Sequence, residues 1–285
     1  MKRTLSLIVA LTFVTFAYFD TAKADDALGV SKDYNLFVLE DFVSTSSDVQ
    51  GAFAAGGNVT IDSYGVASTI DTPADTPTLI VGGDLNYGQG MVFTGSGLVG
   101  GSIEGVNKRV INGIENGATI TGNAATGIDF SGEFSKLTAL SRDLASVEPN
   151  GSVAYRWGGI YLSGDCQSQT QVFNLDGLTV LNSNHISLSC VPVDATIIFN
   201  IDGALAGFKN IGLSQFHSRA PKILYNFHEA TRIEFTWIGV EGTVLAPFAH
   251  LDNPRGQVNG TVIAKSWDGP MELHDFPFTG DLVQF

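Results

Sequence analysis

Short apolar segments that begin with glycine recur along this chain, and this repetition constrains the fold more than any other feature. The segment GTVLA begins at Gly242, and the nearly identical GTVIA begins at Gly260. Repeats of roughly twenty residues that combine a strand with a glycine corner are typical of solenoid proteins. We therefore expect Val244 and Val262 to stack in register on neighbouring windings, about 4.8 Å apart.

Glycine doublets mark the same pattern in the N-terminal half of the chain. Glycine, of which the chain has 33, lets the backbone turn at corners where a Cβ would clash. A β-sandwich is the alternative, because its strands also recur at short intervals. We favour a mainly β fold of the right-handed β-helix or β-solenoid-like type. The doublets lie in GGNV (56–59), GGDL (82–85) and GGSI (100–103), and TGNA (121–124) has a similar shape.

One segment, SGEFSKLTALSRDLASVEPNG, has apolar residues at helical spacing instead. It predicts a helix over about residues 132–148, with Ser131 as N-cap and Pro149 just beyond the C-terminus. Because its apolar stripe must be buried, we expect the helix to lie along the flank of the solenoid. The stripe consists of Phe134, Leu137, Leu140, Leu144 and Val147.

The N-terminus resembles a secretion signal. Lys2 and Arg3 precede an uncharged apolar stretch, and Ala22-Lys23-Ala24 places small residues where a signal peptidase reads. We predict that residues 1–24 are a signal peptide and that residues 27–285 form a single domain. A membrane anchor is the alternative, but the apolar stretch is short for spanning a bilayer, so we expect no membrane span after cleavage.

The net charge of the chain limits the classes of partner that it can bind. The formal charge is −14, which argues against nucleic acid and anionic lipid as ligands. Acidic side chains can bind calcium, but the sequence has neither an EF-hand loop nor a GGxGxD repeat. We therefore predict no cofactor.

Two cysteines, Cys166 and Cys190, are the only ones in the chain. In an exported protein the simplest expectation is a disulfide bond between them. Their separation excludes a CxxC-type redox motif, and two lone cysteines make a poor metal site.

Several phrases in fixed order resemble the choice-of-anchor A family. Near the N-terminus these are YNLFVLEDF (34–42), SDVQG (47–51) and AAGGNV (54–59), and GTVLAPFAHL, VNGTVIAKS and ELHDFPFTGDL follow near the C-terminus. The resemblance implies a secreted or surface-bound bacterial module of β-solenoid type with adhesive function. Its partner would be a surface, a polysaccharide or a matrix protein. The chain ends without an LPxTG-like signal or an apolar tail, so we expect release or non-covalent retention rather than wall anchoring.

The first of these phrases also supplies candidate binding residues. Asp33, Tyr34, Asn35 and Asp41 combine aromatic and polar groups that suit ligand contact. We favour the other interpretation, that this phrase caps the open end of the solenoid, where an exposed strand edge would otherwise pair with other chains.

Motifs for catalysis and metal binding are weak. His228-Glu229 begins like a zinc motif, but Arg232 stands where the second histidine should be. His274 lies between Glu272 and Asp275, and we expect it to satisfy backbone groups where the last winding closes. We predict no catalytic residues and no metal site. The remaining histidines are His185, His217 and His250.

Carboxylate pairs keep a glycan hydrolase or lyase on a β-helix as the alternative function, because glycosidases need only two suitably spaced carboxyl groups. The two sets that would share a face are Asp62, Asp71 and Asp84, and Asp165, Asp176 and Asp202. Most of them are also typical of Asp-Gly turns and caps.

Aromatic and threonine residues raise two further possibilities. Trp157, Trp237 and Trp267 would suit an aromatic platform for sugars, although a tryptophan in a strand such as EFTWIG is more often core. Ice binding is a third hypothesis for a flat solenoid face, but the threonines form no regular TxT ladder. They are Thr60, Thr119, Thr121, Thr243 and Thr261.

Overall fold

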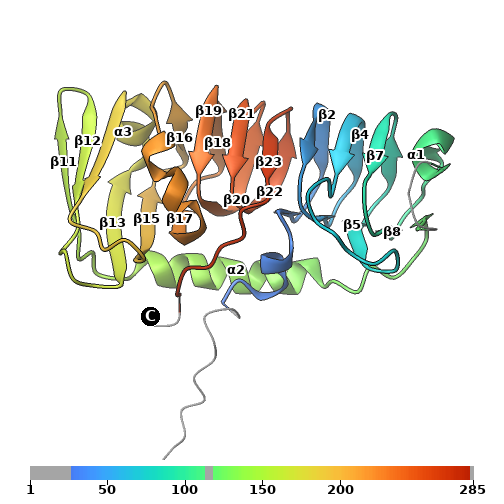
Figure 1. Cartoon of the computed structure of the whole chain (residues 1–285), viewed down its shortest axis with the longest axis horizontal. Coiled ribbons are helices and arrows are strands. Elements are labelled where there is room, and N and C mark those ends of the chain that lie inside the picture. Colours follow the sequence, from blue (N-terminus) through green and yellow to red (C-terminus); the bar gives the residue numbers. More distant parts are fainter. Residues whose placement is uncertain (1–26, 113–117, 283–285) are drawn as a thin grey trace, which may run out of the picture.

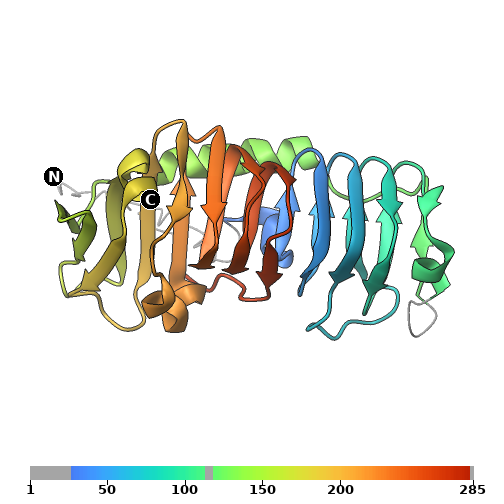
Figure 2. The same ribbon diagram turned by 90° about the horizontal axis from the view of Figure 1, so that it is seen from above.

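Parallel strands from successive windings pair side by side and form one long rod (Figure 1 and Figure 2). The structure is a computed structural model that describes residues 27–112 and 118–282. Val244 pairs in register with Val262, so the two similar segments lie on neighbouring windings as predicted. The mainly β, solenoid-like fold is confirmed, and the predicted signal segment 1–24 lies outside the described residues.

The strands build three long faces. Face A contains, in spatial order, β13 (Thr170–Asp176), β15 (Thr196–Asp202), β17 (Ile223–Phe227), β20 (Thr243–Asp252), β22 (Val262–Asp268), β1 (Leu36–Val38), β3 (Phe53–Ala55), β5 (Pro77–Val81), β8 (Ser96–Val99) and β10 (Ile120–Thr121). Face B contains β16 (Leu205–Lys209), β18 (Arg232–Thr236), the ends of β20 and β22, the first halves of β2 (Phe42–Val49) and β4 (Val59–Val66), β6 (Leu85–Tyr87) and β9 (Gly105–Val106). Face C contains β19 (Ile238–Glu241), β21 (Gly256–Asn259), β23 (Glu272–His274), the second halves of β2 and β4, and β7 (Gly90–Val92).

The chain enters the rod near its middle rather than at an end. β1 pairs with β22 on one side and with β3 on the other. From there the windings proceed to β10, helix α2 (Phe130–Ala145) carries the chain back along the rod, and the later windings return to the middle (Figure 1). The first and last windings are therefore neighbours. The expectation that the N-terminal phrase caps an open end is wrong, because both edges of β1 are already paired.

Different elements close the two ends of the rod. At one end, β11 (Ser152–Arg156) and β12 (Gly159–Ser163) form an antiparallel hairpin, and β14 (His185–Ser189) pairs with β12. The predicted disulfide between Cys166 and Cys190 is formed there. Helix α1 (Lys108–Asn112) lies at the opposite end (Figure 1). The remaining elements are helix α3 (Gly177–Asn182) and the 3-10 helices η2 (Gly29–Asp33) and η4 (Ser214–Lys222).

The glycine doublets occupy stacked corners, as the repeat predicted. A Cβ on Gly82 would lie 2.2 Å from the carbonyl oxygen of Gly56, and one on Gly100 would lie 2.3 Å from that of Gly82. Side chains essentially never approach a backbone atom so closely. The first glycine of each doublet is therefore required because the next winding passes directly against it.

Helix α2 covers the outside of face A, as expected for its apolar stripe. Phe134, Leu137 and Leu144 are buried, and the ring of Phe37 in β1 stacks on that of Phe134 at 5.5 Å. The helix begins two residues before the predicted position, because Asp129 rather than Ser131 accepts the capping hydrogen bond from Gly132. None of the helices in the described part of the chain has both the length and the apolar character needed to cross a bilayer.

A row of asparagines fixes the C-terminal half of α2 to face A. Asn174, Asn200 and Asn226 are in register on β13, β15 and β17. Asn226 Nδ2 donates to the Ser141 carbonyl (2.8 Å) and to Asn200 Oδ1 (2.9 Å), while Ser141 Oγ donates to Asn226 Oδ1 (2.6 Å). Asn200 Nδ2 donates to the Leu144 carbonyl (2.8 Å). The sheet thus satisfies polar groups of the helix as well as burying its apolar stripe.

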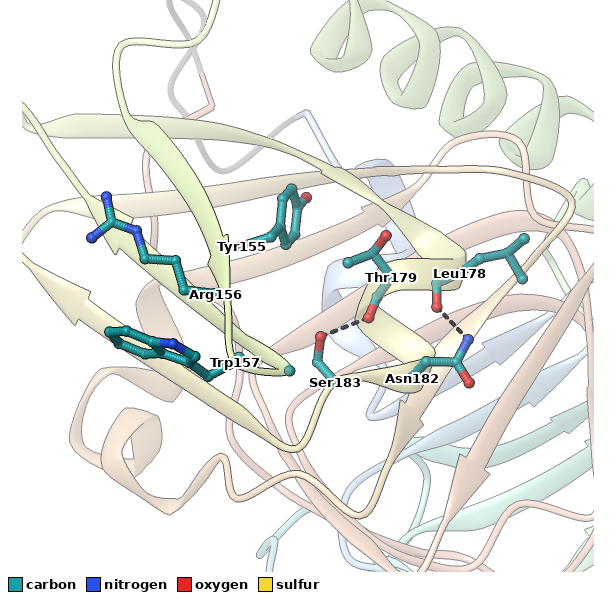
Figure 3. Close-up of a pocket in the computed structure, with 9 residues that line it drawn as sticks. Tyr155, Arg156, Trp157, Leu178, Thr179, Asn182 and Ser183 are labelled. Atoms are coloured by element: carbon teal, nitrogen blue, oxygen red, sulfur yellow. Dashed lines mark hydrogen bonds between the residues drawn. The ribbon is translucent and has the colours of Figure 1, made fainter.

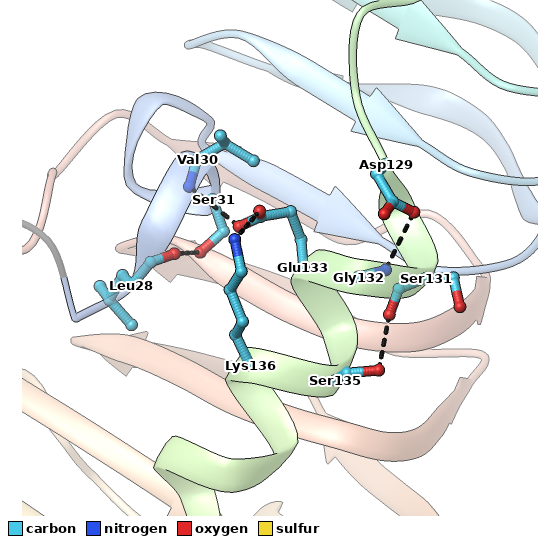
Figure 4. A network of polar contacts seen from close by, with 9 residues as sticks. All are labelled: Leu28, Val30, Ser31, Asp129, Ser131, Gly132, Glu133, Ser135 and Lys136. Atoms are coloured by element: carbon cyan, nitrogen blue, oxygen red, sulfur yellow. Dashed lines mark hydrogen bonds and ion pairs between the residues drawn. The ribbon is translucent and has the colours of Figure 1, made fainter.

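The first turn of α2 also holds the start of the described chain (Figure 4). Glu133 is largely buried, and its carboxylate accepts a hydrogen bond from the Val30 N–H (3.4 Å) and pairs with Lys136 Nζ (2.6 Å). Ser31 Oγ donates to the Leu28 carbonyl (2.6 Å) within the same cluster. The N-terminal segment is therefore tied to the helix before it enters the central winding.

Candidate functional site

The candidate binding residues near the N-terminus lie in separate environments. Asn35 is 3% exposed, and its Nδ2 donates to the carbonyls of Gly260 (2.8 Å) and His274 (3.0 Å), which joins the first winding to the last. Tyr34 is half-buried, and burial followed by the Asp33 carboxylate raises its pKa to about 12. Asp33 itself is exposed. Of these three, Asn35 has a clear structural role.

Asp41 belongs to a ladder of corner side chains. Its Oδ1 accepts from the Asn58 N–H (2.7 Å), Asn58 Oδ1 accepts from the Asp84 N–H (2.9 Å), and Asp84 Oδ1 accepts from the Ser102 N–H (2.7 Å). Each side chain therefore satisfies a backbone donor of the next winding. The sequence carried this signal, because the last three residues directly follow the glycine doublets.

The carboxylates considered for catalysis mostly cap turns. Asp176 and Asp202 are in register on β13 and β15. Asp176 accepts from the Thr179 N–H (2.7 Å) as the N-cap of α3, and Asp202 accepts from the Gly177 N–H (3.2 Å). Hydrogen bonds from its neighbours, first from the Ser168 hydroxyl, hold the pKa of Asp165 well below its usual range.

A polar row on face C ends at His274 of β23 and is contacted by His217 of η4. His217 Nδ1 lies 2.9 Å from Glu241 Oε2, which also accepts from Asn259 Nδ2 (2.8 Å), and His274 Nδ1 lies 2.7 Å from Asn259 Oδ1. His274 thus bonds to a side-chain amide rather than to the backbone groups expected from the sequence. In residues 27–112 and 118–282, no three histidine, cysteine or acidic side chains are placed to hold a metal ion.

One of the three tryptophans is buried and the other two are exposed. Trp267 is 1% exposed and belongs to the core, as expected for a strand tryptophan. Trp157 and Trp237 are 87% and 79% exposed. The core expectation for Trp237 is wrong because β18 ends at Thr236, and Trp237 occupies the following corner with a φ of 52°. Its strand-like sequence context concealed this boundary.

Trp157 projects from the hairpin turn at one end of the rod. Arg156 pairs with Gly159, which leaves Trp157 and Gly158 as the two turn residues, with φ values of 51° and 75°. Two-residue hairpins with positive φ at both positions are type I′ turns, in which Asn-Gly is preferred. Trp157 therefore occupies a position that the fold alone would give to a small polar residue.

An open hollow of about 430 Å³ lies between this hairpin and helix α3 (Figure 3). Tyr155 lies on the side of α3, and burial raises its pKa. Thr179 and Asn182 line the floor, where Asn182 Nδ2 donates to the Leu178 carbonyl (2.7 Å). We call the exposed set Tyr155, Arg156, Trp157 and Leu178 the end patch.

Aromatic contacts extend the end patch across β12. The Trp157 ring packs edge-on against Tyr161 at 6.3 Å, and Tyr161 contacts the His185 ring at 5.5 Å. A cluster of exposed aromatic side chains beside an arginine is typical of binding surfaces. The arrangement suits contact with a large partner, since the hollow is open rather than enclosed.

Comparison with known proteins identifies an adhesive family. The family model described as "Putative Ice-binding-like adhesive domain" matches residues 27–275. Among solved structures, the ice-binding protein from the Antarctic ascomycete Antarctomyces psychrotrophicus is similar at 10% identity and a TM-score of 0.36, over 87% of this chain and 96% of that one. No curated protein matches. The broader adhesive class implied by the sequence phrases is supported, and the choice-of-anchor A name stays a prediction.

Proposed function

Because the chain belongs to the family of ice-binding-like adhesive domains, we propose that it is an extracellular binding module, an adhesin or matrix component that attaches to a surface or a polymer. The observation that carries this proposal is the end patch, where Trp157 projects from the tip of a rod. We include in the proposal a cleaved signal over residues 1–24, a single domain over residues 27–285, and action outside or on a bacterial cell.

The identity of residue 157 supports a binding role, since the turn does not need tryptophan. Positive φ costs most side chains about 1–2 kcal/mol, and Asn or Gly adopts it far more readily. A side chain that is 87% exposed regains little of this cost by packing. A large aromatic residue held in such a position is the type of residue that anchors a partner.

The charge of the protein limits what that partner is. The chain carries a formal charge of −14, which disfavours nucleic acid and anionic membranes. Trp157 offers an exposed aromatic ring that packs edge-on against Tyr161, and Arg156 adds planar hydrogen-bond donors. This chemistry suits a polysaccharide or a matrix protein.

The experiment is a bead-attachment assay with purified protein on surfaces coated with polysaccharides or matrix proteins. The variant is Trp157→Asn, which gives the turn its preferred Asn-Gly sequence. Val193→Asn is the matched control, because Val193 is also apolar and 77% exposed but lies outside the end patch. We expect Trp157→Asn to attach more weakly than the wild type while remaining folded, and Val193→Asn to attach like the wild type. Equal attachment by all three proteins would count against the proposal.

Ice binding is the second candidate, because the family description names it. The threonines singled out in the sequence do not share one face, since Thr243 and Thr261 are buried in face A whereas Thr60 is exposed on face B. A thermal-hysteresis measurement on the wild type separates the two functions. Hysteresis that Trp157→Asn leaves unchanged would favour ice over the proposed adhesion.

A further inference from the structure

We propose that a second hollow binds one extended chain of a neutral polysaccharide. This hollow, the corner groove, has a volume of about 700 Å³ and lies where face B turns into face C. It shares no residue with the end patch. Its principal lining residues are Thr45, Trp237, Arg255, Gln257, Asp268 and Glu272.

Trp237 stands at a corner that the preceding winding builds with asparagine. Lys209 pairs with Thr236, so Asn210 is the equivalent residue on the preceding winding. On the following winding Arg255 is in register with Trp237, and Asn253, two positions earlier, is the corner residue with positive φ. The φ values of Asn210, Trp237 and Asn253 are 56°, 52° and 49°. The same backbone therefore forms with a small polar side chain, and the indole, which is 79% exposed, contributes little to the corner.

The groove runs along the rod across several windings. Trp237 lies on one winding, Asn253 on the next, Gly269 on the one after, and Ser46 on the central winding that pairs with β22. Three steps of about 4.8 Å give a length of about 14 Å. A groove of this length and openness fits several sugar rings of an extended chain rather than one enclosed small molecule.

The lining suits carbohydrate chemistry. The apolar face of a sugar ring stacks on an indole, and the guanidinium of Arg255 lies 5.9 Å from the Trp237 ring centroid, where it holds the platform in place. Gln257, Asp268 and Glu272 add planar amide and carboxylate groups, which bond to the hydroxyls beside an apolar sugar face.

Charge and apolar content distinguish a neutral glycan from other ligands. Two carboxylates, on Asp268 and Glu272, line the groove against one cation, Arg255, so a polyanion is disfavoured. The groove also offers a single exposed aromatic anchor, whereas protein interfaces bury several. Asp252 beside the groove forms an ion pair with Arg232 (Oδ2 to Nη2, 3.0 Å), so its charge is compensated within the protein.

Affinity electrophoresis of the full chain tests the proposal, with neutral dextran, xylan and hydroxyethyl cellulose, anionic alginate and cationic chitosan as probes. The variants are Trp237→Asn, which copies the corner of the preceding winding, and Trp237→Tyr, which keeps an aromatic platform. Val193→Asn is the control, because Val193 is 77% exposed but lies outside both hollows. Thermal melting of each variant shows that it is folded.

We expect retardation by at least one neutral polysaccharide, with affinity reduced about tenfold or more in Trp237→Asn, which corresponds to loss of about 1.4 kcal/mol. Trp237→Tyr should stay within a few-fold of the wild type, and Val193→Asn should be unchanged. Absence of neutral-polysaccharide binding, equal binding of Trp237→Asn, or stronger binding of alginate would each overturn the proposal. Release of reducing ends would also overturn it, in favour of a glycan hydrolase or lyase. If Trp157→Asn weakens bead attachment while Trp237→Asn binds neutral polysaccharide like the wild type, the proposed function stands and the groove proposal fails, so the two ideas fail separately.

Discussion

The asparagine row beneath α2 gives the sharpest prediction about stability. Asn226 is fully buried and makes three hydrogen bonds, two donated through Nδ2 and one accepted through Oδ1. The residue in register on the next winding is Leu245, so this row of face A already accommodates leucine beneath the helix. The variant Asn226→Leu therefore removes the hydrogen bonds and replaces the amide by an apolar side chain of similar size.

The expected loss follows from the bonds removed. Each net hydrogen bond contributes about 1 kcal/mol, and stranded buried partners add to the cost. We expect Asn226→Leu to lower the free energy of unfolding by about 3 kcal/mol in urea denaturation, with the m-value unchanged. The exposed Asn174, whose side chain makes one longer bond to Asn200 (3.3 Å), is the control, and Asn174→Leu should lose less than about 1 kcal/mol.

A double variant tests the mechanism rather than the magnitude. Ser141 Oγ is stranded when Asn226 is replaced, so adding Ser141→Ala should recover about 1 kcal/mol. A loss below about 1 kcal/mol in Asn226→Leu, or a double variant whose loss is the sum of the single losses, would refute the idea that this row docks the helix.

Three further predictions concern the corners, the disulfide and pH. Gly82→Ala should destabilise the protein by about 2–3 kcal/mol, measured by urea denaturation, because its Cβ would meet the Gly56 carbonyl; a neutral effect would mean that the corners are not tightly stacked. Replacing Cys166 and Cys190 by serine should cost about 3 kcal/mol through loss of loop closure, and unchanged melting on reduction would contradict this. Burial raises the pKa of Asp48, and the neighbouring Glu272 carboxylate raises it further. Ionised Asp48 therefore lowers the free energy of unfolding above that pKa. This loss of stability disappears as the pH falls to the unfolded pKa of about 3.9. Asp48→Asn should therefore raise the urea midpoint at pH 7 but not at pH 3, and an equal gain at both would exclude this cause.

Local signals in the sequence predicted most of the fold. The repeated glycine-flanked segments predicted that Val244 stacks on Val262, and the helical spacing of apolar residues predicted α2. The path of the chain was not predictable in this way, because the pairing of β1 with β22 joins distant segments and no local pattern encodes it. The end-cap expectation failed for that reason.

The binding surfaces were predicted only in part. The tryptophans were considered as a sugar platform, but which of them are exposed depends on strand ends that the sequence places poorly. Trp237 is the first residue after β18, whose side chains alternate between buried and exposed, and its own side chain points outward. Asn35 and Asp41, in contrast, have side chains that satisfy backbone groups of neighbouring windings, a role that polar composition does not distinguish from ligand contact.

The central claim is that two exposed tryptophans, Trp157 at one end of the rod and Trp237 at a corner between its faces, carry the function rather than an enclosed cavity. The most direct measurement compares the wild type with the double variant Trp157→Asn/Trp237→Asn in surface attachment, with melting midpoints recorded on the same samples. We predict a folded double variant that no longer attaches to any coated surface that the wild type binds. A double variant with an unchanged midpoint and full attachment would contradict the account.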